Sequence, residues 1–531
     1  MASMTVAFSS CIDETFPEGG TATADQVGAS SAALEGSVNG MSSKLTQGYL
    51  VYGGQTHETD MAYPMFMIAS GEIMGDMYPG ANSGYDWYCD YNTLDRNLGS
   101  NSYYAYLPWF TCYQFIKGAN DIIGSIDAEN ANETQKQFLG IALANRAFDY
   151  WLLTTLFEPV ANKYTDCSKV LGLTVCIVDE NTDGEASKNN PRVTHDVITK
   201  FMLNDLDRAE EYLANYKAKD HLQPDLAVVY GLKARIYMWD EDYANAYKYA
   251  DLAIQTAEKN GAKMMTESEW TDPKSGFTTA CSGWMWYSSY AAEMMGNLCN
   301  FVGWMSSEAN WGYSQFTSPS IDKSLYDKIT GTDFRKNVFL HPDKYDYYNY
   351  KTSRDADFIN NAPAYMSLKF RCKEGNVDDY AVGGAIDIPI MRLEEMYLLR
   401  AEAAGMSQGV EQGISLLTNW VRQYRDKEYV CPATDQRSMQ LAVLDQERIE
   451  LWGEFNAFPN AKRIKPGVMQ NYEGTNAPED IFKINCEGIK PIFNLCIPDY
   501  EMENNQGITK ELNNPDPTQT VRGPSPVGVY Q

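Results

Sequence analysis

Large apolar residues recur at three- and four-residue intervals along several stretches of this chain, and this spacing constrains its fold more than any other feature. In residues 103–126 they stand at Tyr106, Phe110, Tyr113, Ile116 and Ile123. Such spacing gathers them on one face of an α-helix, which must be buried against another element. The same signal covers residues 36–52, 56–75, 132–157 and, from the N-cap candidate Thr194, 194–213. The pattern predicts a mainly α fold of helix hairpins joined by loops containing Gly, Pro or Asn.

Two segments share one pattern of small and apolar residues, which indicates an internal repeat. From Tyr230 the pattern falls on Ala234, Tyr237, Tyr243, Ala246, Ala250 and Ile254. From Tyr397 the same offsets fall on Ala401, Ala404, Val410, Gly413, Leu417 and Val421. Small residues at the crossing positions let paired helices approach closely, which is why helix pairs of the tetratricopeptide type use them.

Composition limits the classes of protein to which the chain can belong. Of its 531 residues, 44% are apolar and 21% are charged, as in an ordinary globular protein. No run approaches the roughly 18 uninterrupted apolar residues that a transmembrane helix needs. The net charge of −28 opposes binding to a phosphate backbone, so no nucleic acid partner is expected.

The eleven cysteines do not form C-x-x-C pairs, so zinc knuckles and thioredoxin-type sites are not expected. Cys11 differs from the others because residues 7–14, AFSSCIDE, resemble the end of a bacterial lipoprotein signal. Only ten residues precede Cys11, fewer than a complete signal needs. We expect Cys11 to be the lipid anchor, the alternative being an exposed thiol. Residues 1–28 are interpreted as a flexible lipoprotein tether or leader.

Several motifs stand in a fixed order along the chain. They are 145–148 (NRAF), 204–209 (NDLDRA), 234–237 (ARIY), 392–403 (RLEEMYLLRAEA), 447–454 (ERIELWGE), 497–501 (IPDYE) and Asn504-Asn505. This set resembles the SusD/RagB family of SusD-like outer-membrane nutrient-binding lipoproteins of Bacteroidetes. Members of that family capture glycans, and sometimes peptides, at the cell surface and pass them to a SusC-like TonB-dependent transporter.

The resemblance implies an architecture for the whole chain. Tetratricopeptide-type helix pairs would form a right-handed superhelical scaffold, with a loop-rich irregular ligand-binding half packed against it. Residues 29–531 would make a single body. The scaffold is predicted at 29–75, 103–260 and 385–465, the ligand-binding inserts at about 76–102 and 262–384, and a C-terminal segment at 466–531. The resemblance also implies binding without catalysis, on the cell surface, with the chain lipid-anchored in the outer membrane.

The aromatic residues that the resemblance favours for ligand binding lie in the two predicted inserts. A glycan site needs aromatic faces for stacking and amides or carboxylates for the hydroxyl groups. The first insert supplies Tyr85, Asp86, Trp87, Tyr88 and Asn92. The second supplies Trp284, Trp286, Tyr287, Trp311 and Tyr313, in a segment that also holds Trp304. Alternation in 281–287 predicts a short strand there. For each of these residues the competing interpretation is a packing role in a small aromatic core.

A third aromatic run, Tyr345-Asp346-Tyr347-Tyr348-Asn349-Tyr350, is interpreted as structural or facing the transporter. Its Asp and Asn side chains are possible ligands for a structural calcium ion, which some relatives carry. No EF-hand spacing supports such a site. No cofactor and no metal site are therefore predicted.

An enzyme, a docking scaffold and a peptide-binding protein would each show a different pattern in the sequence. The four histidines form no HExxH motif, and no GxSxG, P-loop or GxGxxG pattern occurs, so no catalytic residues are assigned. A glycoside hydrolase needs only two carboxylates, which the sequence alone does not exclude. A tetratricopeptide docking scaffold would display its binding residues on the helix pairs, whereas here the Trp and Tyr residues crowd the predicted loops. A peptide-binding RagB-type capture protein remains the nearest alternative to a glycan-binding one.

Overall fold

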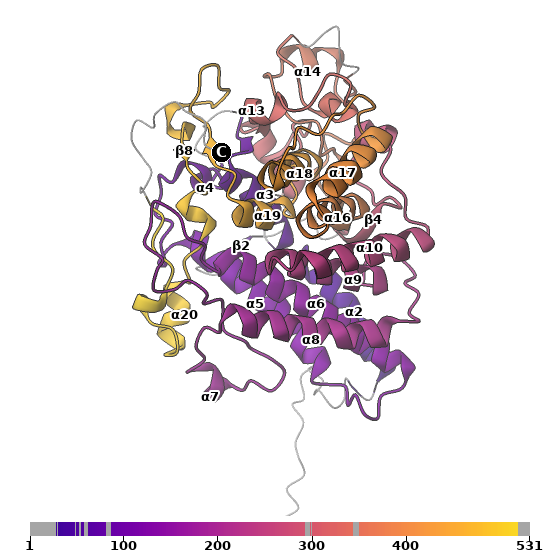
Figure 1. Ribbon diagram of the computed structural model, residues 1–531, viewed down its shortest axis with the longest axis vertical. Helices are drawn as coiled ribbons and strands as arrows, with labels where there is room; N and C mark the ends of the chain where they lie inside the picture. The colour runs from indigo at the N-terminus through magenta and orange to yellow at the C-terminus, as the bar shows by residue number, and fades with distance from the viewer. Residues whose placement is uncertain are drawn as a thin grey trace, which may run out of the picture.

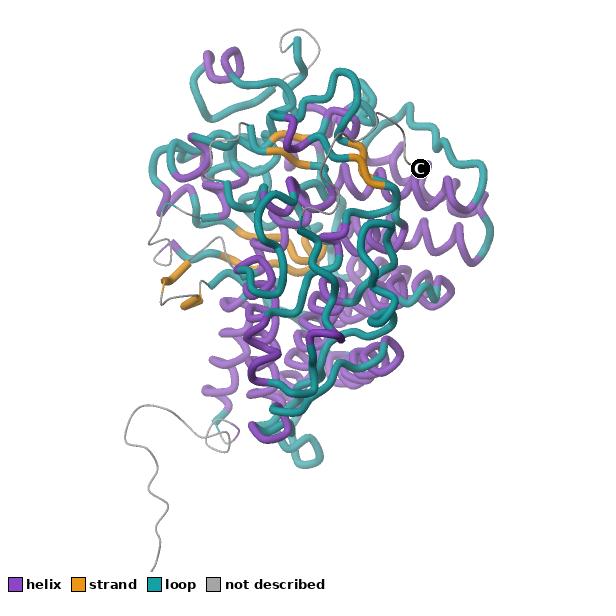
Figure 2. Tube along the Cα trace, turned by 90° about the vertical axis from the view of Figure 1, so that its left-hand side faces the viewer, coloured by secondary structure: helices purple, strands orange, loops and turns teal. Residues whose placement is uncertain are grey.

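Long helices fill one half of the molecule, and loops with short helices cover the other half (Figure 1, Figure 2). The computed structural model describes residues 62–80, 86–292, 300–343 and 350–518, with shorter segments at 28, 30–47, 49–51, 55–57 and 298. Cys11 and Tyr85 lie outside the described residues, as do 344–349 of the third aromatic run.

The long helices pack largely in chain order. They are α2 (Ser31–Lys44), α5 (Tyr103–Ile123), α6 (Glu133–Phe157), α8 (His195–Leu213), α9 (Leu226–Trp239), α10 (Tyr243–Lys259), α16 (Leu393–Ser407), α17 (Val410–Tyr424) and α18 (Gln436–Glu450). α5 packs on α6, α6 on α8, α8 on α9, and α9 on α10. α16 then continues the stack by packing on α10, and both α17 and α18 contact α16 (Figure 1). The predicted mainly α fold is confirmed.

Both segments of the predicted repeat form helix pairs, α9 with α10 and α16 with α17. The small residues stand at the crossings: Ala246 and Ala250 are fully buried. At the α16–α17 crossing, a Cβ atom added to Gly413 would lie 2.7 Å from the Cα of Gly405, so only glycine permits this approach. The superhelical course of the scaffold and the predicted domain boundaries stay predictions.

Capping residues set where these helices begin. The side chain of Asn132 accepts a hydrogen bond from the Gln135 amide, and the Gln135 side chain accepts one from the Asn132 amide, which is the capping box of α6. Thr194 is the N-cap of α8, as predicted. Ser102 caps α5 by accepting a hydrogen bond from the Ala105 amide at 3.2 Å.

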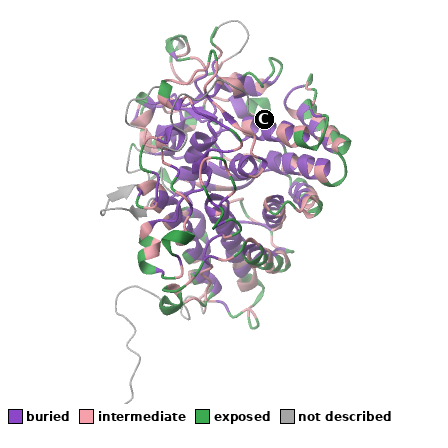
Figure 3. Cartoon of the chain, turned by 60° about the vertical axis from the view of Figure 1, so that its left-hand side comes forward, coloured by how far each residue is buried: buried purple, intermediate pink, exposed green. Residues whose placement is uncertain are grey.

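The predicted helices at 36–52 and 56–75 were too long. α2 ends at Lys44, and α3 (Tyr63–Met74) begins only at Tyr63. Between them β1 (Tyr49–Val51) pairs antiparallel with β2 (Gln55–His57). The sequence places Gly53-Gly54, a dipeptide typical of hairpin turns, between these strands. Every residue of α3 is buried. Figure 3 shows that buried residues fill the inside of the body, whereas exposed residues lie on its outer turns and loops.

The irregular half is built from short elements. Its strands pair antiparallel: β3 (Met77–Tyr78) with β5 (Ser320–Ile321), β4 (Trp284–Ser289) with β6 (Asp387–Arg392), and β7 (Val468–Met469) with β8 (Asn485–Cys486). Its α-helices are α4 (Asp90–Thr93), α11 (Glu267–Thr271), α12 (Phe301–Met305), α13 (Lys323–Tyr326), α14 (Ala356–Asn361), α15 (Tyr380–Gly383), α19 (Ala457–Ile464) and α20 (Asp499–Asn504), and α7 (Gly184–Ser187) lies in the loop before α8. Single 3₁₀ turns are η3 (Gly312–Gln315), η4 (Phe334–Val338), η5 (Lys373–Gly375), η6 (Asp480–Phe482), η7 (Pro491–Phe493) and η8 (Lys510–Leu512). The strand predicted in 281–287 is present as β4.

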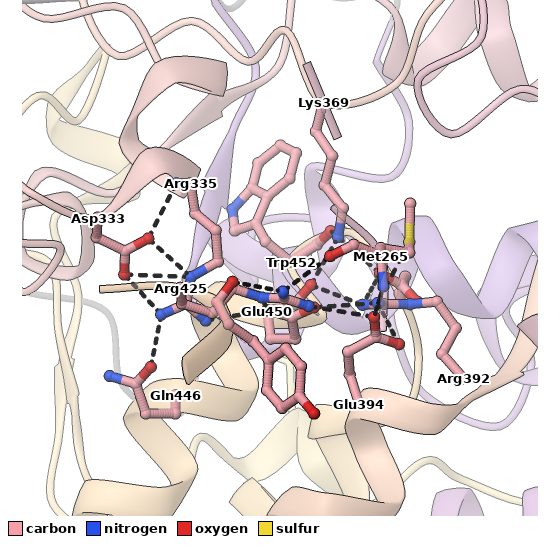
Figure 4. Close-up of polar contacts among 12 residues, drawn as sticks. Met265, Asp333, Arg335, Lys369, Arg392, Glu394, Arg425, Gln446, Glu450 and Trp452 are labelled. Carbon is pink, nitrogen blue, oxygen red and sulfur yellow. Dashed lines mark hydrogen bonds and ion pairs between the residues drawn. The ribbon is translucent and has the colours of Figure 1, made fainter. Parts of the chain in front are cut away.

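A buried ionic network joins the irregular half to the helices (Figure 4). Its basic members are Arg335, Lys369, Arg392 and Arg425, and its acidic members are Asp333, Glu394, Glu450 and Glu454. None has more than 5% of its surface exposed, and the charges balance. Burial lowers the pKa of Lys369 to about 8. The pKa of Arg392 instead stands well above its usual value, because Glu454, Glu394 and Glu450 outweigh the effect of burial. Within the described residues the network ties η4 and β6 to α16, α17 and α18.

Candidate functional site

The two aromatic inserts meet because β3 pairs with β5. Met77 lies opposite Ile321 and Tyr78 opposite Ser320. The pairing is reinforced by the Tyr78 hydroxyl, which donates to Asp322 at 2.9 Å. This short sheet brings the segment around Trp87 next to residues 301–318, more than 200 positions away in the sequence.

The start of the first insert is held by the signature 447–454. The Arg448 guanidinium donates to both carboxylate oxygens of Asp76, with Nε at 2.9 and 3.1 Å. The Trp452 indole donates to the Asp76 carbonyl oxygen at 3.0 Å. The scaffold signature therefore positions the loop that leads to Trp87.

Four aromatic rings from the two inserts form one cluster. Trp87 stacks on Tyr88 with centroids 3.9 Å apart, and Trp304 stacks on Tyr313 with centroids 3.4 Å apart. The two stacked pairs meet edge to face: Trp304 lies 6.4 Å from Trp87 and 5.0 Å from Tyr88. Tyr88 and Trp304 are buried, whereas Trp87 and Tyr313 are half-buried. The inner rings support two outer rings that reach the surface.

The first turn of α5 extends this cluster. Tyr103 and Tyr104 lie 5.6 and 5.7 Å from Trp87, measured between ring centroids, and both are half-buried. The Tyr104 hydroxyl lies within hydrogen-bonding distance of two acceptors, the Trp87 carbonyl oxygen at 3.1 Å and the Asp90 carboxylate. Tyr88 covers one face of the Trp87 indole, so any ligand that stacks on Trp87 would use the opposite face.

Two carboxylates lie next to the cluster. Asp86 is half-buried and accepts a hydrogen bond from the Cys89 amide at 3.3 Å. Burial raises the pKa of Asp86 to about 7, and burial also raises the pKa of Asp90. Carboxylates in such positions are suitable acceptors for sugar hydroxyl groups. The cluster thus offers stacking faces and hydrogen-bond acceptors side by side.

The structure does not bring every predicted site residue to this surface. Trp284 and Trp286 have no exposed surface: Trp284 packs on Phe277, and Trp286 packs on Phe148. Their assignment to the ligand site was wrong for this structure, because a buried ring cannot offer a face to a sugar. Tyr287, two residues before the end of β4, is half-buried and lies in contact with Trp284, apart from the cluster.

Asn92 and Trp311 also have packing roles. Asn92 is fully buried, donates to Glu72 and to the Met77 carbonyl oxygen, and accepts from Lys490. Its predicted role in ligand binding is therefore corrected to that of a core amide. Trp311 is 5% exposed, and Gly383 packs against its ring. Of the described residues predicted for the site, the structure gathers Asp86, Trp87, Tyr88 and Tyr313. Tyr88 has no exposed surface, so its predicted contact with the ligand is corrected to a supporting role beneath Trp87.

Three residues of the cluster were not assigned to the site from the sequence. Trp304 was noted in the second insert, but its stacking with Tyr313 depends on the turn η3, which the sequence does not reveal. Tyr103 and Tyr104 were interpreted as part of an amphipathic helix. The adjacent tyrosines at the beginning of that helix, directly after the Ser102 cap, were the available signal.

Two further kinds of feature were expected to be absent from the chain, a metal site and a membrane-spanning helix. No group of three or more His, Cys, Asp or Glu side chains in it is placed to hold a metal ion. No helix in the same residues combines the length and the apolar character that crossing a membrane requires. The expectation that the chain needs no cofactor stays a prediction.

Comparisons with known proteins agree with the fold. The family described as "Starch-binding associating with outer membrane" matches residues 39–238, and the SusD family matches residues 161–513. No curated protein matches the chain. A SusD-like carbohydrate binding protein from Bacteroides vulgatus superposes with a TM-score of 0.70 at 19% identity, over 91% of this chain and 98% of its own.

Two further solved structures share this arrangement. A SusD superfamily protein from Bacteroides thetaiotaomicron has a TM-score of 0.68 at 18% identity, over 92% of this chain and 100% of its own. Surface glycan-binding protein A from the same species, solved in complex with laminarihexaose, has a TM-score of 0.63 at 14% identity, over 91% and 99%. These identities establish a common fold, and the family match covers more than half of the sequence. The chain belongs to the SusD family.

Proposed function

We propose that this protein captures an oligosaccharide or polysaccharide on the cell surface by stacking it on the half-buried rings of Trp87 and Tyr313. The observation that carries this proposal is the convergence of two distant inserts into one cluster, in which buried rings support half-buried ones. Such support holds the outer rings in place before the ligand arrives, which reduces the entropy lost on binding. Asp86 and Asp90 would accept hydrogen bonds from the hydroxyl groups.

The proposal includes delivery of the glycan and attachment to the membrane. The protein would be held at the outer membrane by a lipid on Cys11 and would pass the glycan to a SusC-like TonB-dependent transporter. The description of one matching family, which associates with the outer membrane, supports this location. A structural neighbour crystallised with laminarihexaose supports a glycan as the ligand. The protein acts by binding, without a catalytic step.

The test is affinity electrophoresis through native gels that contain starch, laminarin, inulin, xylan or mannan. The wild-type protein is expected to be retarded in one of these gels, and Trp87→Ala to lose the retardation. Loss of one stacking platform lowers affinity by about 10-fold for each 1.4 kcal/mol of lost binding free energy. Val430→Ala is the control, because Val430 is 71% exposed and lies between α17 and α18.

Two results would contradict the proposal. If Trp87→Ala is retarded like the wild type, the glycan binds elsewhere, for example in the open cleft of about 370 Å³ lined by Lys328, Asp445 and Arg448. If no gel retards the wild type while a peptide mixture binds in calorimetry, the protein is a peptide-capture member of the family.

A further inference from the structure

An aromatic row begins at the cluster around Trp87 and runs along one face of α5. It contains Tyr103, Tyr106 and Phe110, which are all half-buried. Residues three, four and seven positions apart share a helix face, so these rings lie in one line along α5. Gln114 follows one turn later on the same face and is also half-buried. The row adds to the aromatic surface without belonging to the core.

A residue of the C-terminal signature extends this row. Tyr500 of α20 meets Tyr106 edge to face at 5.7 Å, and Tyr106 stacks on Phe110 with centroids 5.4 Å apart. Tyr500 is 59% exposed, one of the most exposed large apolar side chains among the described residues. The three rings therefore form a raised aromatic surface at the junction of α5 and α20.

The position of Tyr500 is set by contacts that its two neighbours make with α5, with the segment before α5 and with the end of α20. The Trp109 indole donates to Glu501 Oε2 at 3.1 Å, and the Asn505 side-chain amide donates to Glu501 Oε1 at 2.9 Å. The Asp499 backbone amide donates to the Ser100 carbonyl oxygen at 2.8 Å. A side chain flanked by two anchored neighbours is presented to solvent in a defined position.

This surface continues the candidate glycan site. Tyr103 is the shared member, because it contacts Trp87 at 5.6 Å and begins the row on α5. At 1.5 Å per residue, about 10 Å of helix separates Tyr103 from Phe110. A single sugar ring cannot span that distance, whereas an extended oligosaccharide can.

We propose that Tyr106, Phe110 and Tyr500 form a second subsite for the same glycan chain, so that the preferred ligand is a polymer that contacts both aromatic surfaces. This inference rests on the proposed function. The occupant follows from continuity with the cluster and from the chemistry of the surface, since Tyr500 is 59% exposed and an aromatic ring offers a flat face to a sugar.

The experiment compares Tyr500→Ala, Tyr500→Phe and Trp87→Ala with the wild type. The polysaccharide that retards the wild type is cut into oligosaccharides of increasing length, and each is titrated calorimetrically. Tyr500→Ala is expected to weaken binding of the long oligosaccharides by roughly 2- to 10-fold, the range of one aromatic contact, and to leave the shortest ligand unaffected. Tyr500→Phe keeps the ring and should bind like the wild type.

The outcomes separate the two proposals. If Trp87→Ala abolishes binding while Tyr500→Ala binds all lengths like the wild type, the second subsite is refuted and the proposed function stands. If Tyr500→Ala weakens the shortest and longest ligands equally, the ring acts on the first site and the subsite is again refuted. If none of the polysaccharides retards the wild type, both proposals fail. Unchanged melting temperatures establish that the variants are folded.

Discussion

Replacing Glu450 with Gln tests whether the buried ionic network holds the two halves of the molecule together. Glu450 is fully buried and accepts four charge-assisted hydrogen bonds. Two come from Arg425, at 2.8 and 2.9 Å, and one each from Arg335 and Arg392, at 3.0 and 3.1 Å. Burial by itself would raise the pKa of Glu450. The three guanidinium groups outweigh this effect and hold the pKa far below its usual range.

Glutamine keeps the shape of the side chain but removes its charge. The network then carries one uncompensated positive charge, and the new amide group directs N–H bonds at guanidinium groups that are themselves donors. Breaking a buried ion pair by removing one partner costs about 3 to 5 kcal/mol. Because two of the four hydrogen bonds lose their acceptor and the charge is removed, we expect a value in the middle of this range, about 4 kcal/mol.

The assay is guanidinium-induced unfolding followed by tryptophan fluorescence, after refolding has been shown to be reversible. Glu428→Gln, at an exposed position near the end of α17, is the matched control and should change stability by less than about 0.5 kcal/mol. In hydrogen exchange, the amides of η4 and α18, which the network joins, should be the first to lose protection. A destabilisation of Glu450→Gln no larger than that of the control would refute the structural role of the network.

Two further predictions concern stability. Hydrogen bonds to Asp240 and Glu158 raise the pKa of His195 to about 10 in the folded protein, whereas the pKa in the unfolded chain is about 6.5. The stabilisation that His195 contributes is therefore complete below about pH 6.5 and is lost as the pH rises to about 10. Urea midpoints of wild type and His195→Gln should converge over this interval, and a difference independent of pH would contradict the assignment. Gly413→Ala should destabilise the protein by about 1 to 3 kcal/mol because its Cβ would strike the backbone of α16, whereas Gly36→Ala, in open space within α2, should stabilise it by about 0.5 to 1 kcal/mol. Equal thermal shifts in these two variants would disprove the close helix crossing.

The fold was predictable because its signals are local. Helical spacing, the cap at Thr194 and the small residues of the two matching segments each act within a few turns of chain, and the structure forms helices at these places. The helix predictions were wrong where a tertiary contact decides which secondary structure forms. The antiparallel pairing of β1 with β2 interrupts a stretch whose apolar residues also suit a helix, and helical periodicity does not reveal this pairing.

The candidate site was predictable only in part, because the burial of an aromatic side chain is a tertiary property. Trp87 and Trp284 stand in similar aromatic surroundings in the sequence. The first is held at the surface by Tyr88 and Trp304, whereas the second is covered by Phe277 and has no exposed surface. No spacing rule separates these two outcomes, since each depends on which distant segment packs beside the ring.

The same contrast explains why the signature at 447–454 identifies the family better than the ligand. Its charged residues form ion pairs with other segments: Glu450 pairs with Arg335 and Arg425, and Arg448 pairs with Asp76. Changing any of them leaves a buried charge unpaired, so each substitution requires a compensating one elsewhere. The rings of Trp87 and Tyr313 lie on segments whose ends are anchored by this signature and by the β3–β5 pair. Substitutions of these two rings, which form the proposed glycan site, would therefore leave the anchoring contacts in place.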